Sequence, residues 1–511
     1  MNTNPILKAD FPDPDVIRVG DTYYMVSTTM HFMPGGVILR SYDLVHWEIV
    51  THIYEKLDST PGQTLSGGQQ IYGKGMWAPS FRYHNGTFYI CFAANDTKKT
   101  YLYTASKIEG PWKKQAIEGF YHDCSLLFDE DRVYIVYGNT EIHLTELTAD
   151  LKGPKAGGLD RVIIKEEGSC RLGFEGSHIY KINGKYDVFF IHSPGDAWFR
   201  TEACYRADSL EGEFTGRDVL RDDLNYCGQG VAQGGIVDTP EGDWYGILFQ
   251  DRGAVGRIPV VVPVTWVDDF PVFGVAGRVP EELEIKSTRP DHRYAPLFVS
   301  DDFCYEPNQD GKAVLKKEWE FNHEPDDSLW SVTERLGAFR IRTGRLAHKL
   351  EEAVNTLTQR LAFPGCGITV TLDGSSLNPG DYAGLCALQG CFGLIAMTRE
   401  EDGRYLVMKG REAENPLLEG KKIWNDGEEY ERVPLRETTV TLKMTVDFEQ
   451  MRDEAEFFYL DGTEWKKLGR TQKLYFKMDH FTGCRAGLFL YSTRQTGGNA
   501  DFMDFRYEVR K

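Results

Sequence analysis

The sequence lacks the features that mark several large classes of protein. No run of about 18 apolar residues occurs, so no transmembrane helix is expected. The opening residues 1–10 contain no basic region followed by an apolar segment, so no secretory signal is expected. No Gly-x-Gly-x-x-Gly or phosphate-binding loop appears, and no nucleotide or redox cofactor is needed on this evidence. We therefore expect a soluble, cytoplasmic protein whose chemistry requires no cofactor.

Paired cysteines and an excess of positive charge are also lacking. The ten cysteines form no Cys-x-x-Cys pair and have no histidine at zinc-finger spacing, so we interpret them as free, mostly buried thiols. The 58 basic residues are outnumbered by 77 acidic ones, and the net charge is −19. Such a charge disfavours nucleic acids and anionic membranes as partners. A neutral, polyhydroxylated substrate would not be repelled.

The first half contains a weak repeat of tight turns, each followed by aromatic or β-branched residues. The repeat spans roughly 45 to 65 residues per unit, as expected when short strands joined by tight turns form the blades of a β-propeller. We predict five blades over residues 1–273. The turns begin at Gly20, Asn85, Asp131, Asn183 and Gly242.

The second half has a different pattern. Residues 274–300 are proline-rich and irregular, which indicates a linker that wraps between domains. From 301 to 511 several segments alternate with period two, among them 438–446 and 455–460, which predicts a β-sandwich. The chain is therefore expected to be all-β, with a five-bladed propeller followed by a sandwich. Its oligomeric state stays open, a homo-oligomer included.

Three carboxylates stand 7 or 8 residues before a predicted blade turn, namely Asp13, Asp123 and Glu175. They should lie on first strands or their leads, where the ends of the inner strands meet at one mouth of the channel. One acid, one base and a third carboxylate that adjusts them are the parts needed to hydrolyse a glycosidic bond. Taken singly, each is more often a solvated or capping residue.

The neighbours of these carboxylates suggest separate roles. Prolines 12 and 14 bracket Asp13 and should push it toward extended geometry, which suits a base, although a surface turn explains the motif equally well. Glu175 follows Phe174, and a partly apolar setting would raise its pKa and suit a general acid. Asp123 would adjust Glu175 by repulsion between like charges. Asp10 and Asp15 are interpreted as turn formers.

Other residues are candidates for holding a sugar. Arg257 lies inside an apolar strand and needs a carboxylate or sugar hydroxyl as a partner if it is buried, whereas an exposed edge position is the alternative. Phe32, Trp77 and Trp198 are candidate sugar platforms, although core packing is the commoner role of aromatic residues.

Together these motifs resemble glycoside hydrolase family 43, whose members are five-bladed propeller enzymes acting on xylose- and arabinose-containing glycans. The resemblance implies that Asp13 is the general base, Asp123 the aspartate that modulates pKa and orientation, and Glu175 the general acid. It also implies that Phe32, Trp77 and Arg257 hold the terminal sugar.

The second half resembles the concanavalin-like sandwich found behind β-xylosidases of this family, on segments 319–323, 326–330 and 479–483. The resemblance implies that Phe481 closes the pocket and favours exo-cleavage, and that Asp302 and Asp504 share a structural Ca²⁺. Gln233, which we also expect to contact the substrate, stands where many relatives have a histidine near the propeller axis. A histidine-bound calcium is therefore not expected there, although a water cluster could take its place.

The resulting hypothesis is an inverting exo-glycosidase that releases D-xylose from the non-reducing ends of β-1,4-xylooligosaccharides. Inversion requires the carboxyl groups of Asp13 and Glu175 to lie about 6.5 to 9.5 Å apart, with room for a water molecule. An α-L-arabinofuranosidase activity, alone or in addition, is the nearest alternative. A non-catalytic carbohydrate-binding protein is a more distant one.

Overall fold

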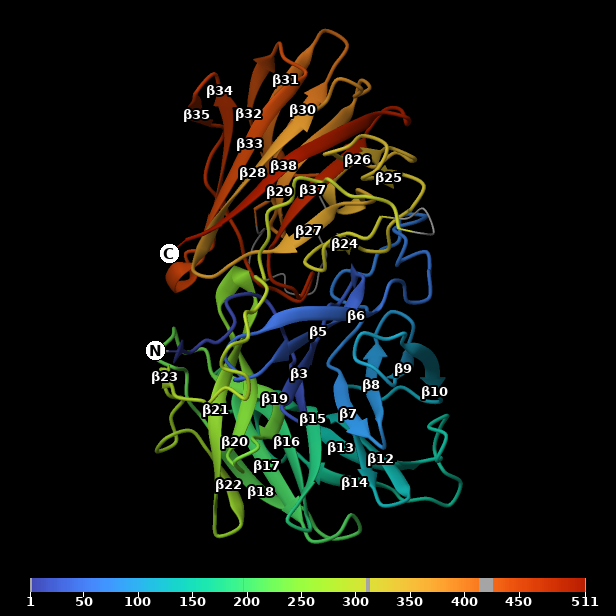
Figure 1. Cartoon of the computed structure of the whole chain (residues 1–511), viewed down its shortest axis with the longest axis vertical. Coiled ribbons are helices and arrows are strands. Elements are labelled where there is room, and N and C mark those ends of the chain that lie inside the picture. Colours follow the sequence, from blue (N-terminus) through green and yellow to red (C-terminus); the bar gives the residue numbers. More distant parts are fainter. Residues whose placement is uncertain (1, 196, 309–312, 413–425, 511) are drawn as a thin grey trace.

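The computed structural model describes residues 2–195, 197–308, 313–412 and 426–510. It is built from antiparallel sheets that form two parts, stacked one above the other in Figure 1. In the described residues the helices are 3₁₀ turns alone, at Gly253–Val255, Leu350–Glu352 and Glu449–Met451. None of the helices found in these ranges has the length or apolar character needed to cross a membrane.

The first part is a ring of five four-stranded sheets, each made from consecutive stretches of the chain. This confirms the predicted five-bladed propeller. Blades one and two contain β2 (Asp15–Val19), β3 (Thr22–Ser27), β5 (Gly35–Ser41), β6 (Glu48–Tyr54), β7 (Ser80–His84), β8 (Thr87–Ala94), β9 (Lys99–Ala105) and β10 (Lys113–Ile117). Blades three and four contain β11 (Ser125–Asp129), β12 (Arg132–Asn139), β13 (Glu141–Leu147), β14 (Asp160–Lys165), β15 (Cys170–Ile182), β16 (Lys185–Pro194), β17 (Thr201–Ala207) and β18 (Thr215–Leu220). Blade five contains β19 (Val231–Asp238), β20 (Trp244–Asp251), β21 (Arg257–Val267) and β22 (Phe270–Phe273).

Each predicted turn joins the first and second strand of one blade. The first strands β2, β7, β11, β15 and β19 contact one another in that order around the ring, and β19 returns to β2. The chain therefore enters every blade at the axis and leaves at the rim. As a result, the leads into the five first strands and the connections between second and third strands gather at one mouth.

A charged side chain, that of Arg82, joins the inner strands near the axis. Arg82 donates to Asp15 at 2.8 Å, to the carbonyl oxygen of Leu126 at 2.8 Å and to that of Ile179 at 3.1 Å, which ties blade two to blades one, three and four. Asp15 is fully buried. Burial opposes ionisation of Asp15, but Arg82 and His178 hold its pKa below the ordinary value. The interpretation of Asp15 as a turn former is therefore wrong, because its carboxylate is committed to long-range contacts.

The second part is a sandwich of two sheets, which confirms the predicted β-sandwich. One sheet runs in the order β32 (Glu428–Leu435), β31 (Arg404–Gly410), β30 (Gly393–Arg399), β29 (Asp381–Leu388), β37 (Arg485–Ser492), β27 (Leu357–Arg360), β24 (Glu320–Asn322) and β4 (Phe32–Met33). The other runs β25 (Trp330–Ser331), β26 (Phe339–Arg342), β38 (Asn499–Val509), β28 (Gly365–Asp373), β33 (Thr439–Asp447), β34 (Glu454–Asp461) and β35 (Glu464–Lys467), with β36 (Gln472–Lys473) paired to β34.

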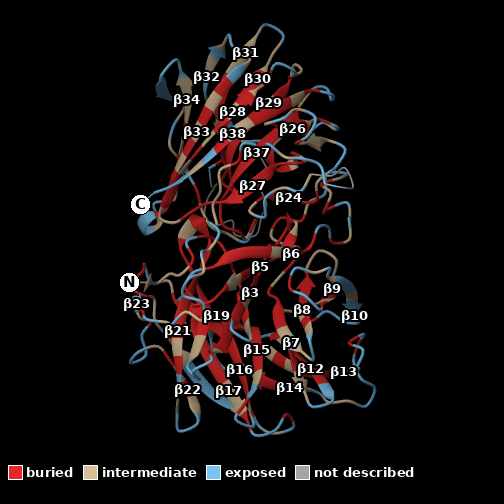
Figure 2. Cartoon of the chain, in the orientation of Figure 1, coloured by how far each residue is buried: buried red, intermediate tan, exposed pale blue. Residues whose placement is uncertain are grey.

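The two parts share structure. Strand β4 comes from the propeller but pairs with β24 of the sandwich, and Ala254, Val255 and Ile258 of the propeller belong to the apolar core of the sandwich. In residues 274–300, β23 (Glu282–Leu283) pairs with β1 (Asn2–Thr3). Figure 2 shows buried residues continuing from one part into the other. The interface is therefore part of the folded core.

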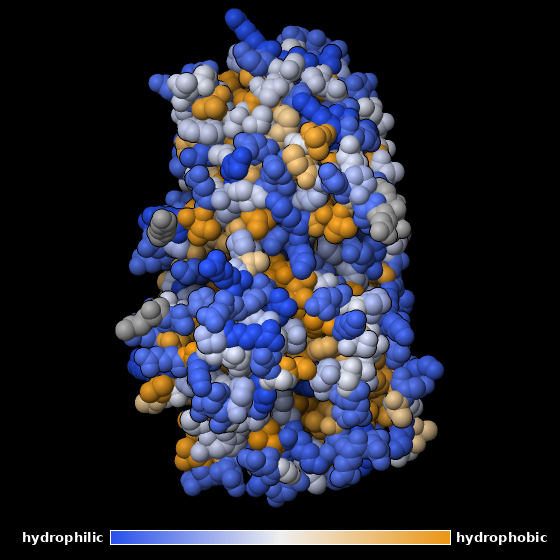
Figure 3. All heavy atoms as spheres, in the orientation of Figure 1, coloured by the Kyte–Doolittle hydropathy of each residue, from blue (hydrophilic) through white to orange (hydrophobic). Residues whose placement is uncertain are grey.

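The surface agrees with the composition. The face of the molecule in Figure 3 is mainly hydrophilic, with hydrophobic groups scattered over it. All ten cysteines are free and seven are buried, which confirms that interpretation.

Candidate active site

The three predicted carboxylates lie in first strands or just before them. Asp13 and Asp123 each stand two residues before a first strand, β2 and β11, and Glu175 lies within β15. The backbone of Asp13 has φ 50°, and that of Asp123 has φ 47°. The prediction of extended geometry at Asp13 is therefore wrong. The restriction imposed by Pro14 is local, whereas an ion pair to Arg257 and a hydrogen bond from Thr28 N to Pro12 O act across the fold.

Asp13 is buried against arginine. Its Oδ1 accepts a hydrogen bond from Arg257 at 2.7 Å, and Arg257 is itself 2% exposed. Burial raises the pKa of Asp13 above its ordinary value, while the charges of Arg257 and Arg200 oppose that rise. Arg257 thus has the carboxylate partner that a buried arginine requires, and the exposed-edge alternative is wrong.

Asp123 and Glu175 both approach the same nitrogen atom of His122. The His122 Nε2 atom is 3.6 Å from Asp123 Oδ2 and 3.8 Å from Glu175 Oε2. Burial is the main cause that raises the pKa of Asp123 to about 7; His122 opposes it, and the charges of Glu175 and Asp13 add to it. The charge of Asp123 is the main cause that raises the pKa of His122 to about 9. A protonated His122 would therefore offset the repulsion between these two carboxylates.

Two side chains here were missed by the sequence interpretation. His122 adjoins Asp123 and was visible as a neighbour, but its approach to Glu175 depends on blades three and four packing together. Asn139, at the end of β12, donates a hydrogen bond to Glu175 Oε2. No signal in the sequence pairs Asn139 with Glu175.

The structure explains why a glycine follows Glu175. Gly176 has φ 64°, and a Cβ atom there would lie 2.5 Å from Gln233 Cδ. The backbone N–H of Gln233 donates to buried Glu202 at 2.7 Å. Gln233 therefore packs directly behind the segment that carries Glu175.

Aromatic side chains surround the carboxylates. The ring of Trp77 lies 5.3 Å from that of His122 and 6.3 Å from that of Phe481. The Arg257 guanidinium lies 4.4 Å from the centre of the Phe481 ring. Phe481 comes from the sandwich, so both parts of the protein contribute to this site.

Two other predicted sugar-contacting residues, Trp198 and Phe32, pack against arginine side chains. Trp198 is 47% exposed beside Arg200, whose guanidinium lies 5.1 Å from its ring. Phe32 is 1% exposed and packs in the interface, with the Arg485 guanidinium 4.1 Å from its ring. Contact between either residue and a sugar stays a prediction.

The proposed calcium ligands lie on neighbouring segments. Asp301 pairs with Phe505 in an isolated bridge, which brings Asp302 and Asp504 onto adjacent backbone segments. Asp504 is ion-paired with Arg506, however, and would have to leave it to bind a cation. Two carboxylates are also few for Ca²⁺, which takes six to eight oxygen ligands. The calcium site stays a prediction.

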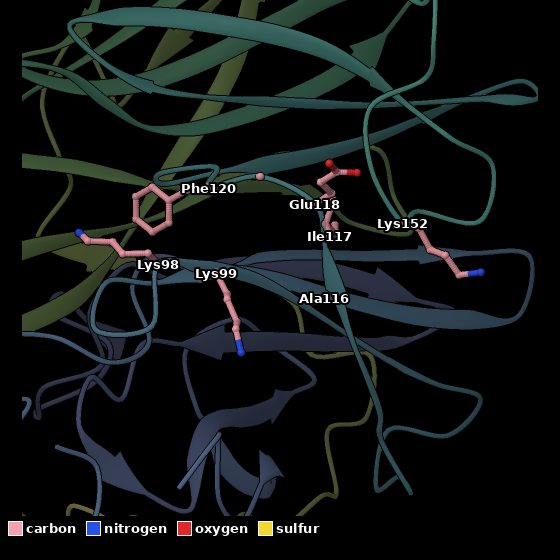
Figure 4. Close-up of a pocket in the computed structure, with 8 residues that line it drawn as sticks. Lys98, Lys99, Ala116, Ile117, Glu118, Phe120 and Lys152 are labelled. Atoms are coloured by element: carbon pink, nitrogen blue, oxygen red, sulfur yellow. The ribbon is translucent and has the colours of Figure 1, made fainter. Parts of the chain in front are cut away.

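A surface pocket lies near the chain segment that leads to His122. It is lined by three lysines, Lys98, Lys99 and Lys152, together with residues 116–120 (Figure 4). Lys99 is paired with Asp58 at 2.7 Å, and Lys152 is paired with Asp150 at 3.0 Å. Two of its three lysines are therefore already paired with carboxylates.

Comparisons with known proteins show the family to which both parts of the chain are similar. The model of Glycosyl hydrolases family 43 matches residues 2–271, and that of the beta-xylosidase C-terminal concanavalin A-like domain matches residues 310–508. A solved structure of a bifunctional GH43-CE protein from Bacteroides eggerthii is 42% identical with a TM-score of 0.91; it covers all of this chain, which spans 64% of that relative. A beta-xylosidase from Formosa agariphila is 27% identical over 99% of this chain and 90% of its own length.

A further relative has a different stated activity. A non-reducing end alpha-L-arabinofuranosidase from Bacteroides ovatus is 28% identical over 66% of this chain and 64% of its own length. The family model alone covers more than half of the chain. The chain is therefore a glycoside hydrolase that belongs to family 43.

Proposed function

We propose that this protein releases D-xylose from the non-reducing ends of short β-1,4-xylooligosaccharides, with inversion at the anomeric carbon. The observation that carries the proposal is the grouping at one mouth of Asp13 with Arg257, and of Glu175 with His122 and Asp123. The beta-xylosidase relative from Formosa agariphila supports the choice of substrate.

In this mechanism Asp13 removes a proton from the attacking water. A base must be ionised to act, and Arg257 favours the ionised form even though burial opposes it. Glu175 donates a proton to the leaving oxygen on the opposite face of the sugar, while Asn139 holds the Oε2 atom of Glu175. The two carboxyl groups are expected about 6.5 to 9.5 Å apart, as an inverting reaction requires.

Two buried polar atoms support binding of a hydroxylated ligand. Trp77 Nε1 and Asp123 Oδ1 have no hydrogen-bond partner among the described protein atoms. Most buried polar atoms in proteins have a hydrogen-bond partner, so an unpartnered one calls for an explanation such as a catalytic role or a bound water. Sugar hydroxyls or the waters they displace would satisfy both atoms. Phe481 would close the far side of this pocket and limit cleavage to chain ends.

The test is hydrolysis of aryl β-D-xylopyranosides with activated and unactivated leaving groups, with NMR of the released sugar. Wild type should release α-xylose first. Glu175→Ala should lose much more activity on the unactivated substrate than on the activated one, because only the unactivated leaving group needs a proton. Asp13→Ala should lose activity on the two substrates about equally. Glu141→Gln, which alters an exposed carboxylate paired with Lys165, is the control. The proposal fails if wild type cleaves no xyloside or releases β-xylose first.

The second candidate is α-L-arabinofuranosidase activity, favoured by the relative from Bacteroides ovatus. Rates on paired aryl β-D-xylopyranoside and α-L-arabinofuranoside measure the balance directly. A higher kcat/KM on the arabinofuranoside would replace the first proposal by the second. A cytoplasmic location and the exclusion of nucleic-acid and membrane partners stay predictions.

A further inference from the structure

Asp10 links the propeller to the sandwich beside the proposed base. It lies three residues before Asp13 and is 3% exposed. Its Oδ1 atom accepts a hydrogen bond from the backbone N–H of Arg257 at 2.8 Å, and its Oδ2 atom accepts one from the backbone N–H of Gly483 at 2.7 Å. The interpretation of Asp10 as a turn former is therefore wrong, because both oxygens are committed to distant parts of the chain.

Both bonded residues adjoin the pocket. Arg257 donates to Asp13 at 2.7 Å and to the carbonyl oxygen of Phe481 at 3.4 Å. Gly483 is two residues beyond Phe481, in the connection between β36 and β37 that we call the Phe481 loop (residues 474–484). The single carboxylate of Asp10 thus holds one residue next to the base and one next to the ring that closes the pocket.

Asp10 packs so closely against Gly256 and Gly483 that neither glycine could carry a side chain. A Cβ atom at Gly256 would lie 2.3 Å from Asp10 Oδ1, and one at Gly483 would lie 2.6 Å from Asp10 Cβ. The carbonyl oxygen of Asp10 also accepts a hydrogen bond from Arg360 of the sandwich at 2.8 Å. An asparagine would fit the same space, but its amide has one acceptor oxygen, so one of the two backbone N–H groups would face a donor.

We propose that Asp10 is a positioning residue that holds the Phe481 loop against Arg257 and so fixes the closed end of the substrate pocket. The inference rests on the proposed function, because it assigns Phe481 and Arg257 to the sugar pocket. Asp10 touches neither water nor sugar in this scheme. It acts through Arg257 and Phe481.

The first test compares Asp10→Asn, Phe481→Ala and the double variant on the aryl xyloside. Asp10→Asn should lower kcat/KM by about 10- to 100-fold, since one buried hydrogen bond to a charged group is lost. In the Phe481→Ala background the same change should cost at least about threefold less than in wild type, because the part of its effect that passes through Phe481 is already lost. Asp301→Asn is the matched control: Asp301 is equally buried and accepts hydrogen bonds from Phe303 N and Trp319 Nε1 inside the sandwich. It should lower Tm and leave kcat/KM unchanged.

Two results would overturn the inference. One is an Asp10→Asn enzyme with wild-type kcat/KM; the other is a loss equally large with and without the Phe481 ring. If a variant fails to fold, hydrogen exchange of wild type, resolved to single amides, still tests the inference. The Gly483 N–H should exchange as slowly as the Cys484 N–H, which donates a hydrogen bond to Ala254 O. If the Gly483 N–H exchanged as fast as that of exposed Gly462, the proposed role of Asp10 would also be rejected. If wild type cleaves neither glycoside, the proposed function fails. The exchange data would still show whether Asp10 holds the Phe481 loop.

Discussion

Replacing Glu320 by glutamine should lower the free energy of unfolding by about 3 to 5 kcal/mol. Glu320 is fully buried in β24 at the interface. Its Oε1 atom accepts a hydrogen bond from Arg360 at 2.8 Å and lies 3.0 Å from His52 Nε2, and its Oε2 atom is 2.9 Å from Arg485 NH1. Glutamine keeps the size but removes the charge, so two buried guanidinium groups lose their counter-charge.

The pKa values give the sign of the pH dependence. Burial opposes ionisation of Glu320, but Arg360 and Arg485 together hold its pKa well below the ordinary 4.5. Burial and the charge of Arg360 lower the pKa of Arg485 to about 10. A carboxyl group with a depressed pKa stabilises the folded state above its unfolded pKa and loses this effect as the pH falls. The difference between wild type and Glu320→Gln should therefore be full above about pH 4.5 and shrink in more acidic solution.

The assay is urea unfolding at pH 7 and at pH 4, followed by tryptophan fluorescence, with midpoints and slopes fitted separately. Glu449→Gln is the control, because Glu449 forms an exposed ion pair with Arg452 and should change the free energy by less than about 0.5 kcal/mol. A Glu320→Gln midpoint equal to that of the control at pH 7 would refute the reasoning. So would a difference that grows as the pH falls.

The remaining predictions concern the active site and the propeller axis. Burial raises the pKa of Asp13, so kcat/KM should fall as the pH drops through a value above the ordinary 3.8, which a pH–rate profile measures. Asn139→Ala removes a donor to Glu175 and should lower kcat by about tenfold with little change in KM; an unchanged kcat would contradict this role. Arg82→Met leaves Asp15 buried without its main partner and should destabilise the fold by about 3 to 5 kcal/mol in urea, whereas a loss below about 1 kcal/mol would show that Asp15 finds another partner.

Local sequence signals predicted the blades because the signal and the structure occupy the same residues. The turn at Asn85 joins β7 to β8, and the turn at Asn183 joins β15 to β16. A tight turn depends on a few adjacent residues with the right backbone preferences, and flanking strands need only their own alternation. Counting such turns therefore predicts the number of blades without any long-range contact.

The sequence by itself also determined the three candidate catalytic carboxylates, since Asp13, Asp123 and Glu175 each stand 7 or 8 residues before a turn. Only the tertiary structure decided their environment. Asp13 adopts a left-handed backbone that its flanking prolines did not predict. Asp10 is no turn former, because its carboxylate accepts hydrogen bonds from both parts of the chain. Ion pairs and hydrogen bonds between residues hundreds of positions apart depend on how sheets pack, and a local pattern carries no record of that packing.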